Sequence, residues 1–287
     1  MTARKLSSNG VRLPDNRHYV GSLTSSSLDD LGSGVAGRRY EDDGYVFLRG
    51  ALPRDAVLDL RQAYLAMFPR EFVRDGDCRR GEFSGRLPRE LPDHGLAGHP
   101  AYEFVRGDTF NAFADQPVLA SIAETLLGGP AERIRRTPLR HFFRGRKAAS
   151  RAHIDGAYIA GGTDDVVTLW IPLGDCPAEA GGLVYLDRSH RDIPVDEIAA
   201  LDAPTNRPDD KRPITHDLKW MSEVTDRRWL IADYRAGDVV AHTPSIVHAS
   251  LDTSTDLMRV STDIRFIRAG SAHDPRWQEY WSADDGY

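Results

Sequence analysis

The chain has 287 residues, of which 40% are hydrophobic, so it is long and apolar enough to bury a substantial core. A net charge of −6 and an isoelectric point near 5.9 argue against general attraction to nucleic acid or to an anionic membrane. The two cysteines are too few for a disulfide framework, and no apolar run of about 20 residues could span a bilayer. We therefore expect a cytoplasmic protein with neither a membrane nor a nucleic-acid partner.

The N-terminal residues 1–37 are predicted to form a flexible arm. Residues 22–37 are rich in serine, glycine and aspartate, a composition typical of mobile segments. We place a single domain over residues 38–287.

Residues 53–128 are predicted to be largely helical. Val57, Leu60 and Tyr64 recur at helical spacing, and a similar apolar stripe precedes Gly128, a residue type that often ends helices. These helices should pack one face against the core.

From residue 133 to residue 268 the pattern changes to that of short β-strands separated by turns. Helices followed by strands favour a mainly β fold with flanking helices, in which the helices cover one sheet of a sandwich or jelly roll. Residues 192–228 are the longest interruption, and we consider them a candidate lid because long unpatterned loops in compact domains are often functional.

The strongest functional signal is His153 and Asp155, two positions apart in an extended segment. Their side chains leave the same face, so a nitrogen and a carboxylate oxygen can converge on one ion. His248 is the best third ligand, which completes the facial triad of non-haem Fe(II) oxygenases. His242 is an alternative third ligand, and the same set could instead hold Zn²⁺ with an activated water in a hydrolase.

Arg259 lies at the start of a strand with two unlike faces. In residues 258–267, apolar residues alternate with Arg259, Ser261, Asp263 and Arg265. A guanidinium on this polar face can hold a carboxylate through two parallel hydrogen bonds. Taken alone, Arg259 is better explained by a structural ion pair with a neighbouring acid, and an HxD motif alone is also a weak signal. The HxD motif, the late histidine and the following arginine are much more specific together.

These motifs resemble those of the phytanoyl-CoA dioxygenase family of Fe(II)/2-oxoglutarate oxygenases, and the chain is most similar to bacterial small-molecule hydroxylases. The resemblance implies a double-stranded β-helix core that uses Fe(II), 2-oxoglutarate and dioxygen. It implies that His153, Asp155 and His248 bind iron, and that Arg259 holds the distal carboxylate of 2-oxoglutarate. The matching stretches are residues 153–158, 168–173, 181–191, 237–238, 248–250 and 257–261.

The resemblance also implies that Trp170 and Ser250 help to bind 2-oxoglutarate. His141 is a further candidate contact, because alternation places it with Leu139 and Phe143 on one strand face. The alternative for His141 is a core residue, since a lone histidine on an apolar face more often packs than binds.

The reaction implied by the resemblance is hydroxylation of an unactivated C–H bond in a free small molecule, in bacterial specialised (natural-product) metabolism. Asp155 argues against halogenation, because related halogenases have a small residue in its place. Desaturation, epimerisation and cyclisation with the same cofactors are alternatives, as is a non-catalytic cupin-like binding protein.

Three residues are candidates for contact with the substrate. Arg188 replaces a glycine that is usual in the family and could bind an acidic group, although a solvent-facing loop residue is the alternative. Tyr158 and Trp220 could supply apolar contacts, with core packing as the alternative for each. Near the end of the chain, Trp277 and Trp281 could dock on the core or form a dimer contact, so both a monomer and a homodimer are open.

Overall fold

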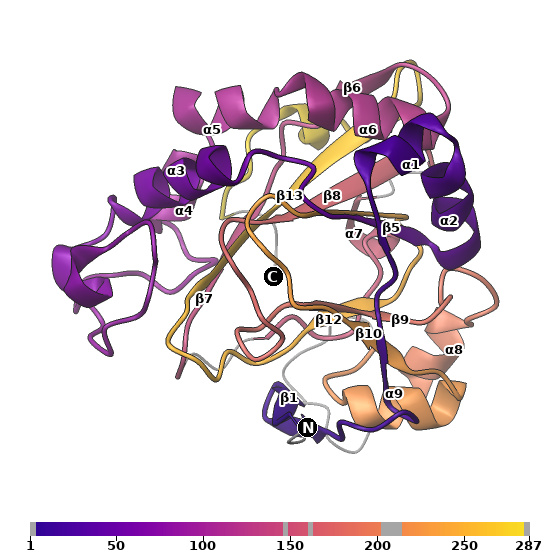
Figure 1. Ribbon diagram of the computed structural model, residues 1–287, viewed down its shortest axis with the longest axis horizontal. Helices are drawn as coiled ribbons and strands as arrows, with labels where there is room; N and C mark the ends of the chain where they lie inside the picture. Colours follow the sequence, from indigo (N-terminus) through magenta and orange to yellow (C-terminus); the bar gives the residue numbers. More distant parts are fainter. Residues whose placement is uncertain (1–3, 146–148, 160–162, 202–213, 284–287) are drawn as a thin grey trace.

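A large, mainly antiparallel sheet runs through the middle of the protein (Figure 1). The computed structural model describes residues 4–145, 149–159, 163–201 and 214–283. In the order in which they pair, the described strands of this sheet are β4 (Ser25–Ser26), β5 (Tyr45–Leu48), β11 (Val239–His242), β8 (Val166–Pro172), β13 (Arg259–Arg268) and β6 (Ala131–Arg133), while β7 (Leu139–Phe142) also pairs with β13.

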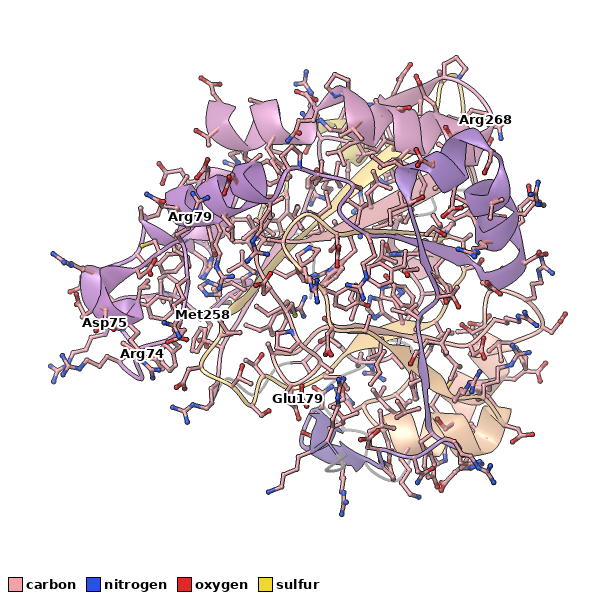
Figure 2. The ribbon with its side chains drawn as sticks, in the orientation of Figure 1. Arg74, Asp75, Arg79, Glu179, Met258 and Arg268 are labelled. Atoms are coloured by element: carbon pink, nitrogen blue, oxygen red, sulfur yellow. The ribbon has the colours of Figure 1, made fainter. Side chains whose placement is uncertain are left out.

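Strand alternation gives the large sheet one apolar face and one mixed face. Along β13, Val260 and Ile264 belong to the largest apolar cluster, together with Leu169 of neighbouring β8. The residues between them belong to the opposite face, on which Trp170 packs in a cluster with Tyr185 of a second sheet. Figure 2 shows how far β13 reaches across the molecule, from near Met258 to Arg268.

A smaller sheet faces the mixed side of the large sheet. The apolar cluster between the sheets draws side chains from both of them. Its described strands, in the order in which they pair, are β12 (His248–Ser250), β9 (Leu183–Leu186), β10 (Trp229–Ile231) and β3 (Val20–Ser22). The space between the two sheets is also where the predicted site residues lie.

Helices cover the outer, apolar face of the large sheet, at the top of Figure 1. The expected stripe of Val57, Leu60 and Tyr64 is buried, and α6 ends at Gly128, whose φ of 70° is the left-handed conformation that suits a helix C-cap. None of the helices in the described ranges is long and apolar enough to cross a bilayer. The helices of this layer are α1 (Leu28–Gly32), α2 (Val35–Asp43), α3 (Arg54–Leu65), α4 (Pro100–Phe104), α5 (Asp108–Ala114) and α6 (Pro117–Leu127).

Further elements surround the smaller sheet and the loops. α9 (Leu218–Thr225) buries Leu218 and Met221 in a second apolar cluster, together with Leu186 and Trp229 of the smaller sheet. The other described elements are β1 (Leu6–Ser8), β2 (Val11–Leu13), η1 (Arg70–Phe72), η2 (Arg74–Gly76), α7 (Gly156–Ile159), α8 (Val195–Ala200) and η3 (Pro275–Gln278).

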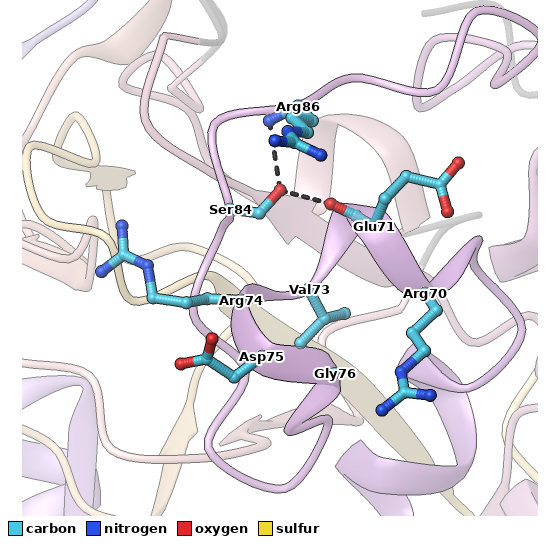
Figure 3. Close-up of a pocket in the computed structure, with 8 residues that line it drawn as sticks. All are labelled: Arg70, Glu71, Val73, Arg74, Asp75, Gly76, Ser84 and Arg86. Atoms are coloured by element: carbon cyan, nitrogen blue, oxygen red, sulfur yellow. Dashed lines mark hydrogen bonds between the residues drawn. The ribbon is translucent and has the colours of Figure 1, made fainter.

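Residues 70–86 form a surface pocket next to the start of β13 (Figure 3). The amide of Phe83 donates to the carbonyl of Asp256 at 2.7 Å, and Arg74 forms an ion pair with the same aspartate at 2.8 Å. None of the residues that line this pocket is a predicted site residue.

The N-terminal segment differs from the flexible arm predicted for residues 1–37. In its described part, β3 pairs in parallel with β10 and β4 pairs in parallel with β5, so this segment joins both sheets. Leu6 and Leu13, in the β1–β2 hairpin, are only 2% and 1% exposed. Strand pairing and these buried leucines anchor the segment, and the serine- and glycine-rich composition of residues 22–37 did not predict this.

Candidate metal and cosubstrate site

Two histidines meet where the segment that carries His153 lies beside β12. His153 and His248 form an antiparallel bridge with hydrogen bonds of 3.0 and 2.9 Å between their backbones. Asp155 follows just before α7, and one ligand atom from each of the three residues lies within 4.8 Å of the others. The structure therefore brings together the three predicted metal ligands.

Both imidazoles present the same nitrogen to the centre of this cluster. Nδ1 of His153 lies 2.7 Å from the Arg151 carbonyl, and Nδ1 of His248 lies 3.1 Å from the Ile246 carbonyl. Because a carbonyl only accepts, each Nδ1 carries the proton and each Nε2 has a lone pair to offer. These Nε2 atoms lie 3.9 and 3.7 Å from Oδ1 of Asp155. Burial lowers the pKa of His153 and lowers the pKa of His248 well below its usual value, which favours the neutral rings that a metal requires.

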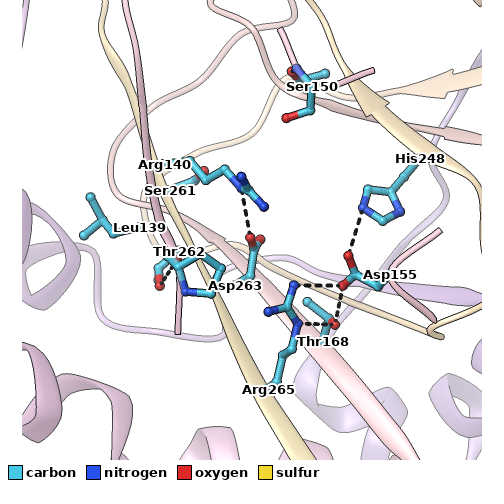
Figure 4. A network of polar contacts seen from close by, with 12 residues as sticks. Leu139, Arg140, Ser150, Asp155, Thr168, His248, Ser261, Thr262, Asp263 and Arg265 are labelled. Carbon is cyan, nitrogen blue, oxygen red and sulfur yellow. Dashed lines mark hydrogen bonds and ion pairs between the residues drawn. The ribbon is translucent and has the colours of Figure 1, made fainter. Parts of the chain in front are cut away.

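The second carboxylate oxygen of Asp155 is held by the protein (Figure 4). Thr168 donates to Oδ2 at 2.8 Å and Arg265 donates to it at 3.2 Å, while Nε2 of His242 lies 3.5 Å away. Burial alone would raise the pKa of Asp155, but the charge of Arg265 and the contact with His242 outweigh it and hold this pKa well below its usual value. Asp155 is therefore an ionised carboxylate whose Oδ1 faces two neutral imidazoles.

This set of donors fits a divalent metal ion of the iron type. Two imidazole nitrogens and one carboxylate oxygen converge here, which is the donor set of the facial triad of non-haem iron oxygenases. His242, the alternative third ligand, faces the other carboxylate oxygen, and its Nδ1 lies 3.1 Å from the hydroxyl of Tyr185. The geometry thus favours His248 as the ligand and places His242 behind the carboxylate.

Arg259 is a buried cation with unused donors in the same interior. It is 2% exposed, its Nη1 donates to Ser261 at 2.9 Å, and its guanidinium lies 4.1 Å from the ring centroid of Phe142. Its Nε and Nη2 have no hydrogen-bonding partner among the described residues, nor does Nε1 of Trp170. Burial lowers the pKa of Arg259 to about 10, so it stays protonated near neutral pH. Such a cation fits an anionic ligand with a planar carboxylate.

Trp170 and Ser250, which were expected to assist the cosubstrate, both belong to the space between the sheets. Trp170 is buried against Tyr234, with ring centroids 4.7 Å apart. Ser250 shares the inward face of β12 with His248, and its hydroxyl accepts from the Ser150 amide at 2.7 Å. Their contacts with a cosubstrate stay a prediction.

His141 lies on the other side of the large sheet. It is the Cα partner of Val260, and its Nδ1 lies 3.2 Å from the hydroxyl of Tyr64 in the helix-covered core. Since Arg259 occupies the opposite face of β13, the structure does not bring His141 to it. Alternation grouped His141 correctly with Phe143, but it could not show that their shared face points toward the helices and away from the smaller sheet.

The candidate substrate residues lie less directly at the site. Arg188 follows β9 with a φ of 52°, and its side chain is 66% exposed and 3.2 Å from Asp43. Trp220 packs against the apolar cluster outside the smaller sheet. The side chain of Tyr158 lies outside the described residues. Substrate contact by any of the three stays a prediction.

The sequence analysis assigned no role to four residues that lie in this interior, Arg140, Thr168, Asp263 and Arg265. Arg265 and Thr168 hold Asp155, and Arg140 approaches Asp263 with 3.4 Å between Nε and Oδ2 (Figure 4). The polar face of β13 was a signal for Arg265 and Asp263. Thr168 begins one of the stretches that match the family, but nothing in the sequence indicated its contact with Asp155, because threonine is an ordinary strand residue.

The candidate lid is described only in part. α8 and α9 flank the smaller sheet, and residues 202–213 lie outside the described residues (Figure 1). Thr215 forms a bridge with Ala152, so this part of the candidate lid runs beside the segment that carries His153. Closure over the site stays a prediction.

Comparison with known proteins agrees with the resemblance found in the sequence. The family model of phytanoyl-CoA dioxygenase (PhyH) matches residues 40–261, which is most of the chain. A curated relative, 1-deoxypentalenic acid 11-beta-hydroxylase of Streptomyces arenae, is 26% identical over 251 residues, covering 82% of this chain and 81% of the relative.

Solved structures share the fold. The non-heme alpha ketoglutarate dependent epimerase SnoN from nogalamycin biosynthesis has a TM-score of 0.57 and 24% identity, covering 86% of each chain. The carbocyclase SnoK from the same biosynthesis has a TM-score of 0.60 and 21% identity, covering 88% of this chain and 90% of its own. One structure of SnoN contains Fe³⁺ and alpha ketoglutarate. With a family model that spans most of its length and a complete histidine-aspartate-histidine triad, this chain belongs to the phytanoyl-CoA dioxygenase (PhyH) family of non-haem iron, 2-oxoglutarate-dependent oxygenases.

Proposed function

We propose that the protein hydroxylates an unactivated C–H bond of a small molecule, with Fe(II), 2-oxoglutarate and dioxygen. One juxtaposition carries this proposal: three converging metal ligands share an interior with Arg259, a buried cation with two unused donors. A dicarboxylate that chelates a metal at one end and meets an arginine at the other suits both features. When bound, the iron supplies the activation of dioxygen, coupled to decarboxylation of the 2-oxo acid.

The chain's own residues bind, orient and exclude water. His153, Asp155 and His248 hold the metal, and Arg259 takes the distal carboxylate through Nε and Nη2. The aromatic cluster around Trp170 keeps this interior dry, which strengthens each charged contact in it. We assign the two facing sheets to a double-stranded β-helix, a rigid support for such a site.

Hydroxylation is the outcome that we propose among those of the relatives. The curated relative at 26% identity is a hydroxylase, whereas the structural relatives include an epimerase and a carbocyclase. Product mass separates these outcomes. Hydroxylation adds one oxygen atom, epimerisation leaves the mass unchanged, and desaturation or oxidative cyclisation removes two hydrogens.

The proposed substrate is a free natural product, and one with an acidic group would suit Arg188. A natural-product substrate is supported by the relatives, since SnoN and SnoK are both from nogalamycin biosynthesis. Screening candidate natural products by succinate yield would identify it.

The test is anaerobic addition of Fe(II) and then 2-oxoglutarate to the full chain. We expect the weak visible charge-transfer band of the chelate, and succinate on admission of air. Arg259→Met should bind the metal but need far more 2-oxoglutarate for the band. A folded, metal-loaded wild type that gives neither band nor succinate would overturn the proposal and reopen the hydrolase and binding-protein alternatives.

A further inference from the structure

The two oxygens of Asp155 have opposite surroundings. Oδ2 accepts from Thr168 and Arg265, and Nε2 of His242 lies 3.5 Å from it. Oδ1 faces Nε2 of His153 and of His248, which are lone-pair donors because their Nδ1 atoms carry the protons. Oδ2 is already occupied by hydrogen-bond donors, whereas Oδ1 faces two imidazole nitrogens with which it could share a cation.

The groups around Oδ2 form a row across three neighbouring strands. Thr168 of β8 is the Cα partner of Arg265 of β13 on one side and of His242 of β11 on the other. All three side chains therefore reach inward at the same level of the large sheet. A row fixed by strand register is rigid, so it holds the carboxylate in one orientation.

The row is also fixed in its hydrogen-bond directions. Nε of Arg265 lies 3.4 Å from Oγ1 of Thr168, so the hydroxyl accepts from the guanidinium and donates its own proton to Asp155. The hydroxyl of Tyr185 lies 3.1 Å from Nδ1 of His242. Nε2 of His242 makes no hydrogen bond among the described residues, so Thr168 and Arg265 are the donors that fix Oδ2.

Two-oxygen binding of a metal by Asp155 would disrupt this row. Rotation of the carboxylate toward the metal would break the contacts to Oδ2, and one of these is a hydrogen bond from a charged donor, which is among the stronger kinds. A carboxylate that binds through one oxygen takes one coordination position. The facial triad then keeps three positions open, two of which a 2-oxo acid needs for chelation.

We propose that Thr168 and Arg265 are positioning residues: by occupying Oδ2 of Asp155, they restrict it to one-oxygen metal binding and keep open the positions at which 2-oxoglutarate chelates. This proposal rests on the proposed function. It assigns these two residues a role in cosubstrate binding although neither contacts the cosubstrate.

The experiment uses Thr168→Val, which removes the hydroxyl with little change in shape, and the matched control Thr262→Val. Thr262 is also buried, but its hydroxyl donates to the Pro138 carbonyl on the opposite face of β13. Each protein is loaded anaerobically with one equivalent of Fe(II), metal content is measured, and 2-oxoglutarate is titrated while the charge-transfer band is followed. Arg265→Lys with Arg268→Lys is a second pair, since Arg268 is the half-exposed end of the same strand (Figure 2).

We expect Thr168→Val to bind one equivalent of metal and to need about tenfold more 2-oxoglutarate for half of the band, as outer contacts to metal ligands typically matter by 10–100-fold. Arg265→Lys should shift in the same direction, and Thr262→Val and Arg268→Lys should titrate as the wild type does. Because Thr168→Val removes no charge, its shift cannot arise from a lost cation near a dianion.

Two results would overturn the proposal. One is a titration of Thr168→Val and Arg265→Lys that matches the wild type, and the other is an equal shift in Thr262→Val, which would indicate general loosening of the core. Absence of the band in the wild type would instead overturn the proposed function, before any variant is compared.

Discussion

Two buried arginines on the same face of β13 have opposite surroundings. Arg265 donates to Asp155 at 3.2 Å, whereas Arg259 has Nε and Nη2 without a hydrogen-bonding partner among the described residues. A paired buried cation positions a group that is already present. A buried cation with unsatisfied donors is costly unless a ligand of opposite charge meets it. In the function that we propose, the metal end of the interior is therefore complete in the chain, whereas the cosubstrate end needs its ligand.

The largest expected effect is at the metal end, from loss of a metal ligand. His248→Ala should abolish stoichiometric Fe(II) or Mn(II) binding, because it removes one of the three residues that we expect to hold the metal. His242→Ala should keep the site and weaken it about 10–100-fold, since His242 contacts the other oxygen of Asp155. Anaerobic equilibrium dialysis measures both, and full metal binding by His248→Ala would reverse the assignment of the two histidines.

The next largest effect is on the stability of the metal-free protein, which should respond differently to replacement of Arg265 and of Arg259. Arg265→Met should lower the free energy of unfolding of the metal-free protein by about 3–5 kcal/mol, because it leaves the buried carboxylate of Asp155 without its cation. Arg259→Met should leave this free energy unchanged or raise it, because it removes a buried cation with unsatisfied donors. Urea unfolding of both variants tests the contrast. Equal destabilisation would mean that Arg259 has a structural partner after all.

Affinity for the cosubstrate should depend more on Arg259 than on Arg265, the reverse of the order expected for stability. Arg259→Met removes two charge-assisted hydrogen bonds to a carboxylate, so the dissociation constant of 2-oxoglutarate should rise about 100-fold. Metal binding should be unchanged, because Arg259 does not contact the triad within the described residues. Calorimetric titration of the Mn(II)-loaded protein measures this, and wild-type affinity in the variant would exclude Arg259 as the carboxylate anchor.

The sequence predicted this interior unevenly, for physical reasons. Alternation alone placed Arg259 and Arg265 on one polar face, and the spacing of His153 and Asp155 predicted that they share an ion. Which arginine is paired could not be predicted, because Arg265 and Asp155 are 110 positions apart and meet only through strand register. The same limit applies to His141: a period of two groups residues by face but does not say which face meets the smaller sheet, so contact of His141 with the cosubstrate stays a prediction.

Composition was the weakest guide. Serine and glycine favoured a mobile arm over residues 1–37, yet the structure pairs Val20 and Ser25 with strands of the two sheets. Backbone pairing makes little demand on side chains at a sheet edge, so a few leucines suffice to anchor such a segment.

The smallest expected effect is at Arg188, which lies outside the interior that contains Arg259 and Arg265. Its side chain is 66% exposed and already lies 3.2 Å from Asp43, so solvent screens any further charge that it meets. If Arg188 binds an acidic group of the substrate, Arg188→Ala should raise KM for that substrate by no more than about fivefold and leave kcat unchanged. Arg191→Ala is a suitable control, because Arg191 lies in the same loop and is also exposed. An unchanged KM would remove Arg188 from the substrate site. A much larger rise would mean that substrate binding buries Arg188, so that solvent no longer screens its charge, as is already the case for Arg259.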